Sequence, residues 1–90
     1  MILHTVNKSP FDHGALTSCL RVAAPEDTIL LIEDGVYGIL SAQPERELLA
    51  LEDDIKTRGL SDKLPDNVKL INHSTFVELT TKASAVQSWY

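Results

Sequence analysis

The sequence is poor in the side chains that build redox or metal sites. Cys19 is the only cysteine among its 90 residues, so no internal disulfide can form and no C-x-x-C pair supports thioredoxin-like dithiol chemistry. His4, His13 and His73 lie far apart, without the spacing of metal ligands. Neither a G-x-G-x-x-G nor a Walker motif is present. We therefore expect a reduced thiol, no metal ion and no bound cofactor.

The chain also lacks basic runs and long apolar runs. Its formal net charge is −5, whereas proteins that bind nucleic acid directly carry a basic patch. No apolar stretch approaches the roughly 18 residues that indicate a transmembrane helix. The first residues, Met1–Val6, lack the charged region that opens a signal peptide. These absences predict a cytoplasmic protein with no direct contact to nucleic acid or membrane.

Short apolar runs alternate with helical patterns along the chain. Strands are predicted at Ile2–Val6, Thr28–Ile32, Leu48–Leu51 and Val68–Ile71. The aliphatic run Thr28–Ile32 is typical of a strand buried on both faces of a parallel sheet. Strand–helix alternation predicts an α/β fold with right-handed crossovers and helices on both faces of a small parallel sheet. We expect one domain, residues 1–90, whose exposed sheet edges favour association.

The first helix is predicted to begin at Ser9-Pro10-Phe11-Asp12. Ser9 suits the N-cap, Pro10 the first helical position, and Asp12 a capping box. The positions that follow at helical spacing on one face are Leu16, Cys19, Leu20 and Ala23.

Three further helices are predicted. Val36–Leu40 is a short helix that ends at Gln43-Pro44, and Asp53–Arg58 is a helix closed by Gly59. Ser74 is the expected N-cap of the last helix. The chain then runs to Trp89, a side chain that we expect to dock against the domain or a neighbouring subunit.

Cys19 has two interpretations. As a small apolar side chain on the Leu16/Leu20 face it packs in the core, like many free cysteines. As a single accessible thiolate it accepts and passes on persulfide sulfur, which needs no second cysteine. Because Cys19 lies inside the predicted helix, a low pKa then requires a nearby cation, and Lys8, His13 and Arg21 are the candidates in sequence.

Acidic residues follow two of the predicted strands. Glu33-Asp34-Gly35 lies where open α/β sheets place their sites, although Asp-Gly is also a common tight turn. Asp53 and Asp54 open a helix, where carboxylates interact favourably with the helix dipole. A small hydrolase or isomerase that uses these acids is the enzymatic hypothesis, without a convergent motif to support it. His4 is interpreted as a structural side chain.

Several segments resemble the DsrH/TusB family, the small subunits of the DsrEFH and TusBCD sulfur-relay complexes. The resembling segments keep the family's order and are Leu3–Phe11, Glu33–Tyr37, Asp54–Leu60, Phe76–Thr81 and Val86–Trp89. Ser18-Cys19-Leu20 matches a phrase in the first helix of DsrH-type members, and some TusB-type members lack that cysteine. The segment between Leu40 and Leu48 is shorter than in other members.

The resemblance implies a three-layer α/β/α sandwich with a parallel sheet of four or five strands. It also implies a heterohexamer with DsrE/TusD-like and DsrF/TusC-like subunits, which exchanges sulfur with donor and acceptor proteins. The sulfur serves 2-thiolation of the tRNA wobble uridine in the Tus system, and dissimilatory sulfur oxidation in the Dsr system. The chain is then a non-autonomous subunit of a sulfurtransferase, with Cys19 either a secondary sulfur carrier or, in a purely structural subunit, a packing residue.

Overall fold

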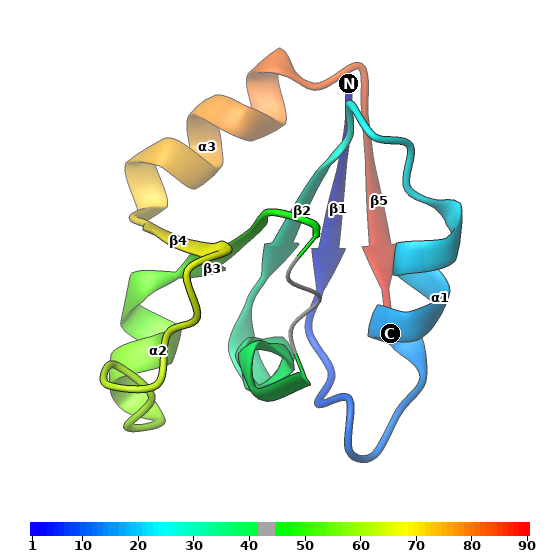
Figure 1. Ribbon diagram of the computed structural model, residues 1–90. Coiled ribbons are helices and arrows are strands. Elements are labelled where there is room, and N and C mark those ends of the chain that lie inside the picture. Colours follow the sequence, from blue (N-terminus) through cyan, green and yellow to red (C-terminus); the bar gives the residue numbers. More distant parts are fainter. Residues whose placement is uncertain (42–44) are drawn as a thin grey trace.

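Five strands form one sheet in the computed structural model, which describes residues 1–41 and 45–90 (Figure 1). They are β1 (Ile2–Val6), β2 (Thr28–Leu31), β3 (Leu48–Leu51), β4 (Val68–Ile71) and β5 (Ala85–Trp89). The strand order is β4-β3-β2-β1-β5, and every neighbouring pair is parallel. The predicted parallel α/β sheet is confirmed. The four predicted strands have the expected bounds, except that β2 ends one residue early.

β5 is the strand that carries no sequence signal of its own. It pairs with β1 at the sheet edge, with Ile2 opposite Ala85 and Val6 opposite Trp89. Every residue of β5 except the half-buried Trp89 is exposed. A strand that faces solvent at an edge needs no continuous apolar run. Residues 85–89 are therefore a strand through non-local pairing with β1, seen in Figure 1 as the red and blue arrows side by side.

The helical segments of the described residues cover both faces of the sheet. They are α1 (Ala15–Val22), the 3-10 helix η1 (Glu33–Ser41), α2 (Glu52–Thr57) and α3 (His73–Lys82). From β1 to β4 the chain moves in one direction across the sheet, so right-handed crossovers put α1, η1 and α2 on one face. α3 carries the chain back from β4 to β5 and so lies on the other face, which confirms the α/β/α sandwich. None of these helices is long and apolar enough to cross a bilayer.

The main core lies between the sheet and the layer formed by α1, η1 and α2. Five of the strand side chains in it are at most 1% exposed: Val6, Ile29, Leu31, Leu48 and Ala50. The helical segments add Leu16, Cys19, Val36, Ile39 and Ile55. On the opposite face, α3 buries none of its own residues. The two helical layers therefore contribute unequally to the stability of the domain.

The prediction that the first helix begins at Ser9 is wrong, because α1 begins at Ala15. Ser9 closes a separate turn instead: its carbonyl oxygen accepts from the N–H groups of Asp12 (3.2 Å) and His13 (3.1 Å). Its hydroxyl accepts from Phe11 N–H at 3.3 Å. Gly14, a poor helix former, separates this turn from the helix and occupies the N-cap of α1.

The other helix boundaries are partly as predicted. Gly59 has the positive φ of 66° expected just after α2. Ser74 is not the cap of α3, because the side chain of Asn72 accepts from Thr75 N–H at 2.9 Å and begins the helix two residues earlier. Asparagine directly after a strand caps as well as serine does. The predicted break at Gln43-Pro44 lies outside the described residues.

η1 begins against the end of β1, and Gly35 permits this close approach. Ile32 N–H donates to the carbonyl oxygen of Val6 at 3.0 Å, and Gly35 N–H donates to that of Ile32 at 2.8 Å. A Cβ atom at Gly35 would overlap the carbonyl group of Val6. The contact fixes η1 at the carboxyl end of the sheet.

Gly35→Ala is therefore expected to destabilise the domain by about 1–3 kcal/mol or more, because backbone must move to admit the methyl group. Gly14→Ala is the matched control, since nothing lies within 4 Å of a Cβ at that position. Urea unfolding followed by circular dichroism measures both variants. Equal losses of stability in the two variants would contradict this account of Gly35.

Candidate functional site

Cys19 lies on the face of α1 that packs against the sheet. Its side chain is fully buried in the main core. Burial raises the pKa of the Cys19 thiol to about 11, an effect that the positive charge of Arg46 opposes and the carboxylate of Asp27 increases. Such a thiol is protonated at neutral pH, and the thiolate is the reactive form. In this conformation Cys19 is an unreactive core side chain.

The cation that acts on Cys19 is not one of those predicted. Lys8, His13 and Arg21 were the candidates in sequence, whereas Arg46, from the segment before β3, is the group that lowers the pKa of the thiol. A surface hollow of about 420 Å³ runs beside α1 and is lined by Thr17, Leu20, Arg21, Glu45 and Arg46. Thr17, Leu20 and Arg21 of α1 line this hollow, and Cys19 lies on the side of the same helix that faces the core.

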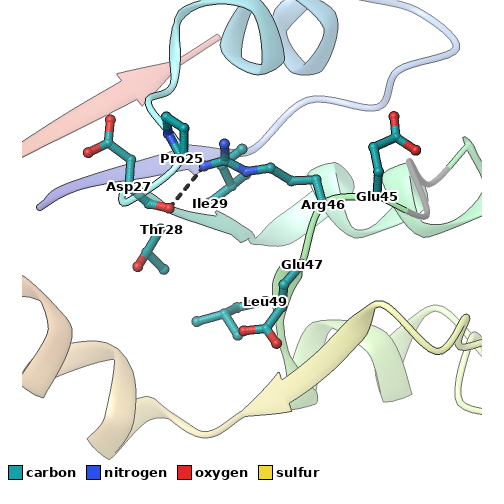
Figure 2. Close-up of a pocket in the computed structure, with 8 residues that line it drawn as sticks. All are labelled: Pro25, Asp27, Thr28, Ile29, Glu45, Arg46, Glu47 and Leu49. Carbon is teal, nitrogen blue, oxygen red and sulfur yellow. Dashed lines mark hydrogen bonds between the residues drawn. The ribbon is translucent and has the colours of Figure 1, made fainter.

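Arg46 joins the amino-terminal ends of three strands. In Figure 2 its side chain extends toward Asp27, and its guanidinium lies beside the backbone of that residue. Nη2 donates to the carbonyl oxygens of Ala24 (3.0 Å) and Asp27 (2.9 Å). The carbonyl oxygen of Arg46 accepts from Asn67 Nδ2 at 2.8 Å. This contact lies in a cleft of about 430 Å³. Figure 2 draws the residues that line it: Pro25, Asp27, Thr28, Ile29, Glu45, Arg46, Glu47 and Leu49.

The chemistry of this cleft is structural. The guanidinium that faces it is already bound to two backbone carbonyls, and Glu45 and Glu47 flank it with negative charge. An anionic ligand would have to displace those hydrogen bonds and approach two carboxylates. Arg46 therefore links the turn before β2 to β3, and the cleft around it offers no anion site.

A chain of buried hydrogen bonds crosses the sheet through His4. Trp89 Nε1 donates to His4 Nδ1 at 3.0 Å, and His4 Nε2 lies 3.0 Å from Asp27 Oδ2. Because an indole N–H can only donate, Nδ1 of His4 must accept, and the imidazole proton sits on Nε2 and points at Asp27. His4 is only 2% exposed. It is a satisfied structural side chain, as the sequence indicated, and Trp89 docks against its own domain.

Asp27 collects hydrogen bonds from three directions. Besides His4, the backbone N–H groups of Ile2 (2.9 Å) and Ala24 (3.0 Å) donate to its carboxylate. The hydrogen bond from His4, helped by that from Ile2, lowers the pKa of Asp27 to about 2, while burial acts in the opposite direction. Asp27 thus ties β1 to the turn that precedes β2 as an acceptor that is ionised at neutral pH. No local sequence pattern indicates this role of Asp27, because its partners Ile2 and His4 come from β1.

The acids at the carboxyl end of the sheet are joined by Arg58. Its Nε lies 3.0 Å from Asp34 Oδ1, and its Nη1 lies 3.6 Å from Asp54 Oδ1. Asp54 Oδ2 also accepts from the backbone N–H of Glu33 at 2.7 Å. Carboxylates engaged in this way hold η1 to α2. The side chain of Asp53 is exposed and takes no part in these two ion pairs.

Of the remaining candidates, His73 lines a small hollow of about 220 Å³ together with Glu33 and Asp54. His13 and His73 are both exposed. Among residues 1–41 and 45–90, no group of three or more His, Cys, Asp or Glu side chains is arranged to hold a metal ion. The candidate functional residue thus stays the one that the sequence singled out, Cys19, in an environment that suppresses its reactivity.

The chain resembles one family over most of its length. The family described as "DsrH like protein" matches residues 8–86. "Protein TusB" of Yersinia pestis (strain Pestoides F) is 38% identical over 96 residues, which cover 98% of this chain and 100% of that protein. "Protein TusB" of Yersinia pseudotuberculosis serotype O:1b (strain IP 31758) matches to the same extent.

Two solved structures share the architecture. The crystal structure of the ychN protein from E. coli superposes with a TM-score of 0.80 over 97% of each chain, at 19% identity, and supports the fold alone. The solution structure of protein Tm0979 from Thermotoga maritima has a TM-score of 0.72 and 33% identity, covering 90% of this chain and 92% of that one. Both likenesses agree with the parallel five-stranded sheet of the described residues.

The hydrogen bonds to Asp27 predict a specific acid sensitivity. A carboxylate whose folded pKa is about 2, against an ordinary value of 3.8, stabilises the fold above pH 3.8 and loses that contribution as the pH falls toward 2. We expect Asp27→Asn to lower the midpoint of thermal unfolding at pH 7, and the gap from the parent protein to narrow as the pH falls through this window.

The neighbouring exposed acid supplies the control. Glu26→Gln removes the same charge without these hydrogen bonds and should leave the unfolding midpoint near that of the parent protein. Circular dichroism melts between pH 7 and pH 2 measure all three proteins. A gap between Asp27→Asn and the parent protein that stays constant with pH would show that the ionised carboxylate is not what stabilises the turn.

Proposed function

The chain belongs to the DsrH/TusB family, and from that premise we propose that it is a subunit of a cytoplasmic sulfur-relay complex. The observation that carries the proposal is the match to TusB relatives, at 38% identity over 98% of this chain and 100% of theirs. Because these relatives are TusB proteins, we assign the chain to the relay that supplies sulfur for 2-thiolation of the tRNA wobble uridine. Dissimilatory sulfur oxidation is the second candidate, favoured by the match to the DsrH description and by Cys19 itself.

We propose that the chain acts only within a complex. Its one thiol is buried, so we assign the principal reactive cysteine to another subunit. The partners that fit are DsrE/TusD-like and DsrF/TusC-like subunits in a heterohexamer, together with sulfur-donor and sulfur-acceptor proteins. The helix α3, none of whose residues is buried, and the exposed edge strand β5 leave ample surface for such contacts.

Cys19 has two proposed roles that differ in what they require of α1. As a packing residue it needs nothing beyond the conformation described. As a secondary sulfur carrier it needs α1 to open, so that its thiolate can attack the terminal sulfur of a persulfide. A new S–S bond then forms at Cys19, the S–S bond of the donor breaks, and the donor cysteine leaves as a thiolate. Full burial and a thiol pKa of about 11 support packing.

Co-expression tests the assembly. We expect the chain to form one complex with its DsrE/TusD-like and DsrF/TusC-like partners, containing two copies of each subunit by native mass spectrometry. In cells, deletion of its gene should lower 2-thiouridine in tRNA, and the intact gene should restore it. A chain that stays monomeric beside both partners would remove the support for the subunit role. Unchanged 2-thiouridine in a strain that loses sulfur oxidation would favour the second pathway.

Persulfide loading separates the two roles of Cys19. If Cys19 packs, mass spectrometry of the assembled complex after exposure to a persulfide donor should find sulfur on a partner cysteine and none on Cys19. Cys19→Ala should then relay sulfur at the parent rate. Alanine is the better test residue, because Cys19→Ser would leave a hydroxyl group in the core. A buried hydroxyl group without a hydrogen-bond partner lowers the stability of the fold by about 1–3 kcal/mol. Sulfur on Cys19, with slower relay by Cys19→Ala, would instead establish the carrier role.

A further inference from the structure

A second cleft lies between the turn that follows β1 and the helix η1. It has a volume of about 450 Å³ and is lined by Ser9, Phe11, Asp12, Asp34, Tyr37 and Leu40. In Figure 1 these two segments lie next to each other at the lower end of the sheet, beyond the arrowheads of β1 and β2. The cleft is separate from the surroundings of Cys19 and Arg46, which lie toward the other ends of the strands.

The walls of this cleft expose large apolar side chains. Phe11 is 67% exposed and Leu40 is 48% exposed, while Tyr37 between them is half-buried. Two exposed apolar side chains that line the same cleft, one of them a phenylalanine, indicate an interaction site rather than ordinary protein surface. Aromatic side chains at such positions often supply much of the binding energy of an interface.

Both walls are held in place by backbone hydrogen bonds. On one side, the Ser9 hydroxyl and carbonyl oxygens accept from the N–H groups of Phe11, Asp12 and His13. On the other side, η1 is fixed to the end of β1 by the close approach of Gly35 to Val6. The fold thus holds the backbone of an exposed Phe11 in a fixed position. A preformed cleft loses little conformational entropy when it is occupied.

The rim of the cleft is acidic. Asp34 is paired with Arg58 through one carboxylate oxygen but is itself 63% exposed. Asp12 has no ion-pair partner among residues 1–41 and 45–90. No basic side chain lines the cleft. Its charge is therefore complementary to a lysine or arginine that approaches together with an apolar side chain.

We propose that this cleft docks a neighbouring subunit of the relay complex, which inserts an apolar side chain against Phe11, Tyr37 and Leu40 and pairs a lysine or arginine with Asp12. The proposal rests on the proposed function, because it takes its occupant from the co-assembled partners. It assigns one contact surface of the complex to the carboxyl end of the sheet.

The test measures the affinity of the chain for its co-purified partner subunits. Phe11→Ser should raise the Kd at least about tenfold, as expected for an aromatic anchor. Asp12→Asn should raise it by a smaller factor and should weaken its dependence on salt. Both side chains are exposed, so neither change should alter the circular dichroism spectrum or the midpoint of thermal unfolding.

Val22→Ser is the matched control, because Val22 is 65% exposed at the end of α1 and does not line the cleft. It should leave the Kd unchanged. Hydrogen exchange should be slower in residues 9–12 and 37–40 of the assembled complex than in the free chain. Unchanged exchange there, with parent affinity for Phe11→Ser, would overturn the docking proposal while the complex itself still supports the proposed function.

Two other outcomes are distinguishable. If the parent chain forms no complex with the partners, the proposed function fails and the docking proposal fails with it. If the isolated chain forms a dimer that Phe11→Ser abolishes, and binding to the partners is unaffected by that change, the cleft is occupied by a second copy and the proposed occupant is wrong. Analytical ultracentrifugation of the isolated chain separates this case.

Discussion

The hydrogen-bond chain from Trp89 through His4 to Asp27 is the interaction on which the attachment of the edge strand β5 to this small sheet depends. It links β5, β1 and the turn before β2 through two contacts of 3.0 Å. β5 buries little else, because every residue before Trp89 is exposed. The helix that delivers it, α3, buries none of its residues. The edge strand is therefore held by its backbone ladder to β1, by the hydroxyl of Thr5 that donates to that of Ser88 at 3.4 Å, and by one indole N–H that finds a buried acceptor.

The strands were predictable and the connections between them were only partly so. Runs such as Leu48–Leu51 carry their own signal, because a strand buried by neighbours on both sides must be apolar throughout. The prediction that the first helix begins at Ser9 was wrong for an equally local reason. Ser9 does cap a turn, but Gly14 separates that turn from α1. β5 and the His4–Trp89 contact could not be predicted, because they depend on the return of the chain across the sheet, which leaves no periodic pattern in residues 85–89.

The candidate site shows the same division between local and non-local information. The sequence singled out Cys19 because it is the only cysteine, and the helical spacing that placed it beside Leu16 also indicated its burial. What it could not supply was the charge around the thiol, since Arg46 comes from the segment before β3, far from α1 in sequence, and Asp27 is brought close by the turn after α1. Local chemistry alone did not indicate a sulfur relay. That conclusion came from the resemblance along the whole chain, as expected when a fold hosts many functions.

The pairing of β1 with β5 has a consequence during synthesis on the ribosome. Ile2 lies opposite Ala85, so one edge of β1 has no partner until residues 85–89 have been translated. Pairings at such long separation in sequence form late, because a large loop must close before they are stabilised. Until then the apolar residues Leu3 and Val6 belong to an edge strand, whose unpaired backbone N–H and C=O groups can pair with those of another nascent chain. Fast pairing of β5 with β1 once residues 85–89 have been translated would therefore protect this protein from aggregation.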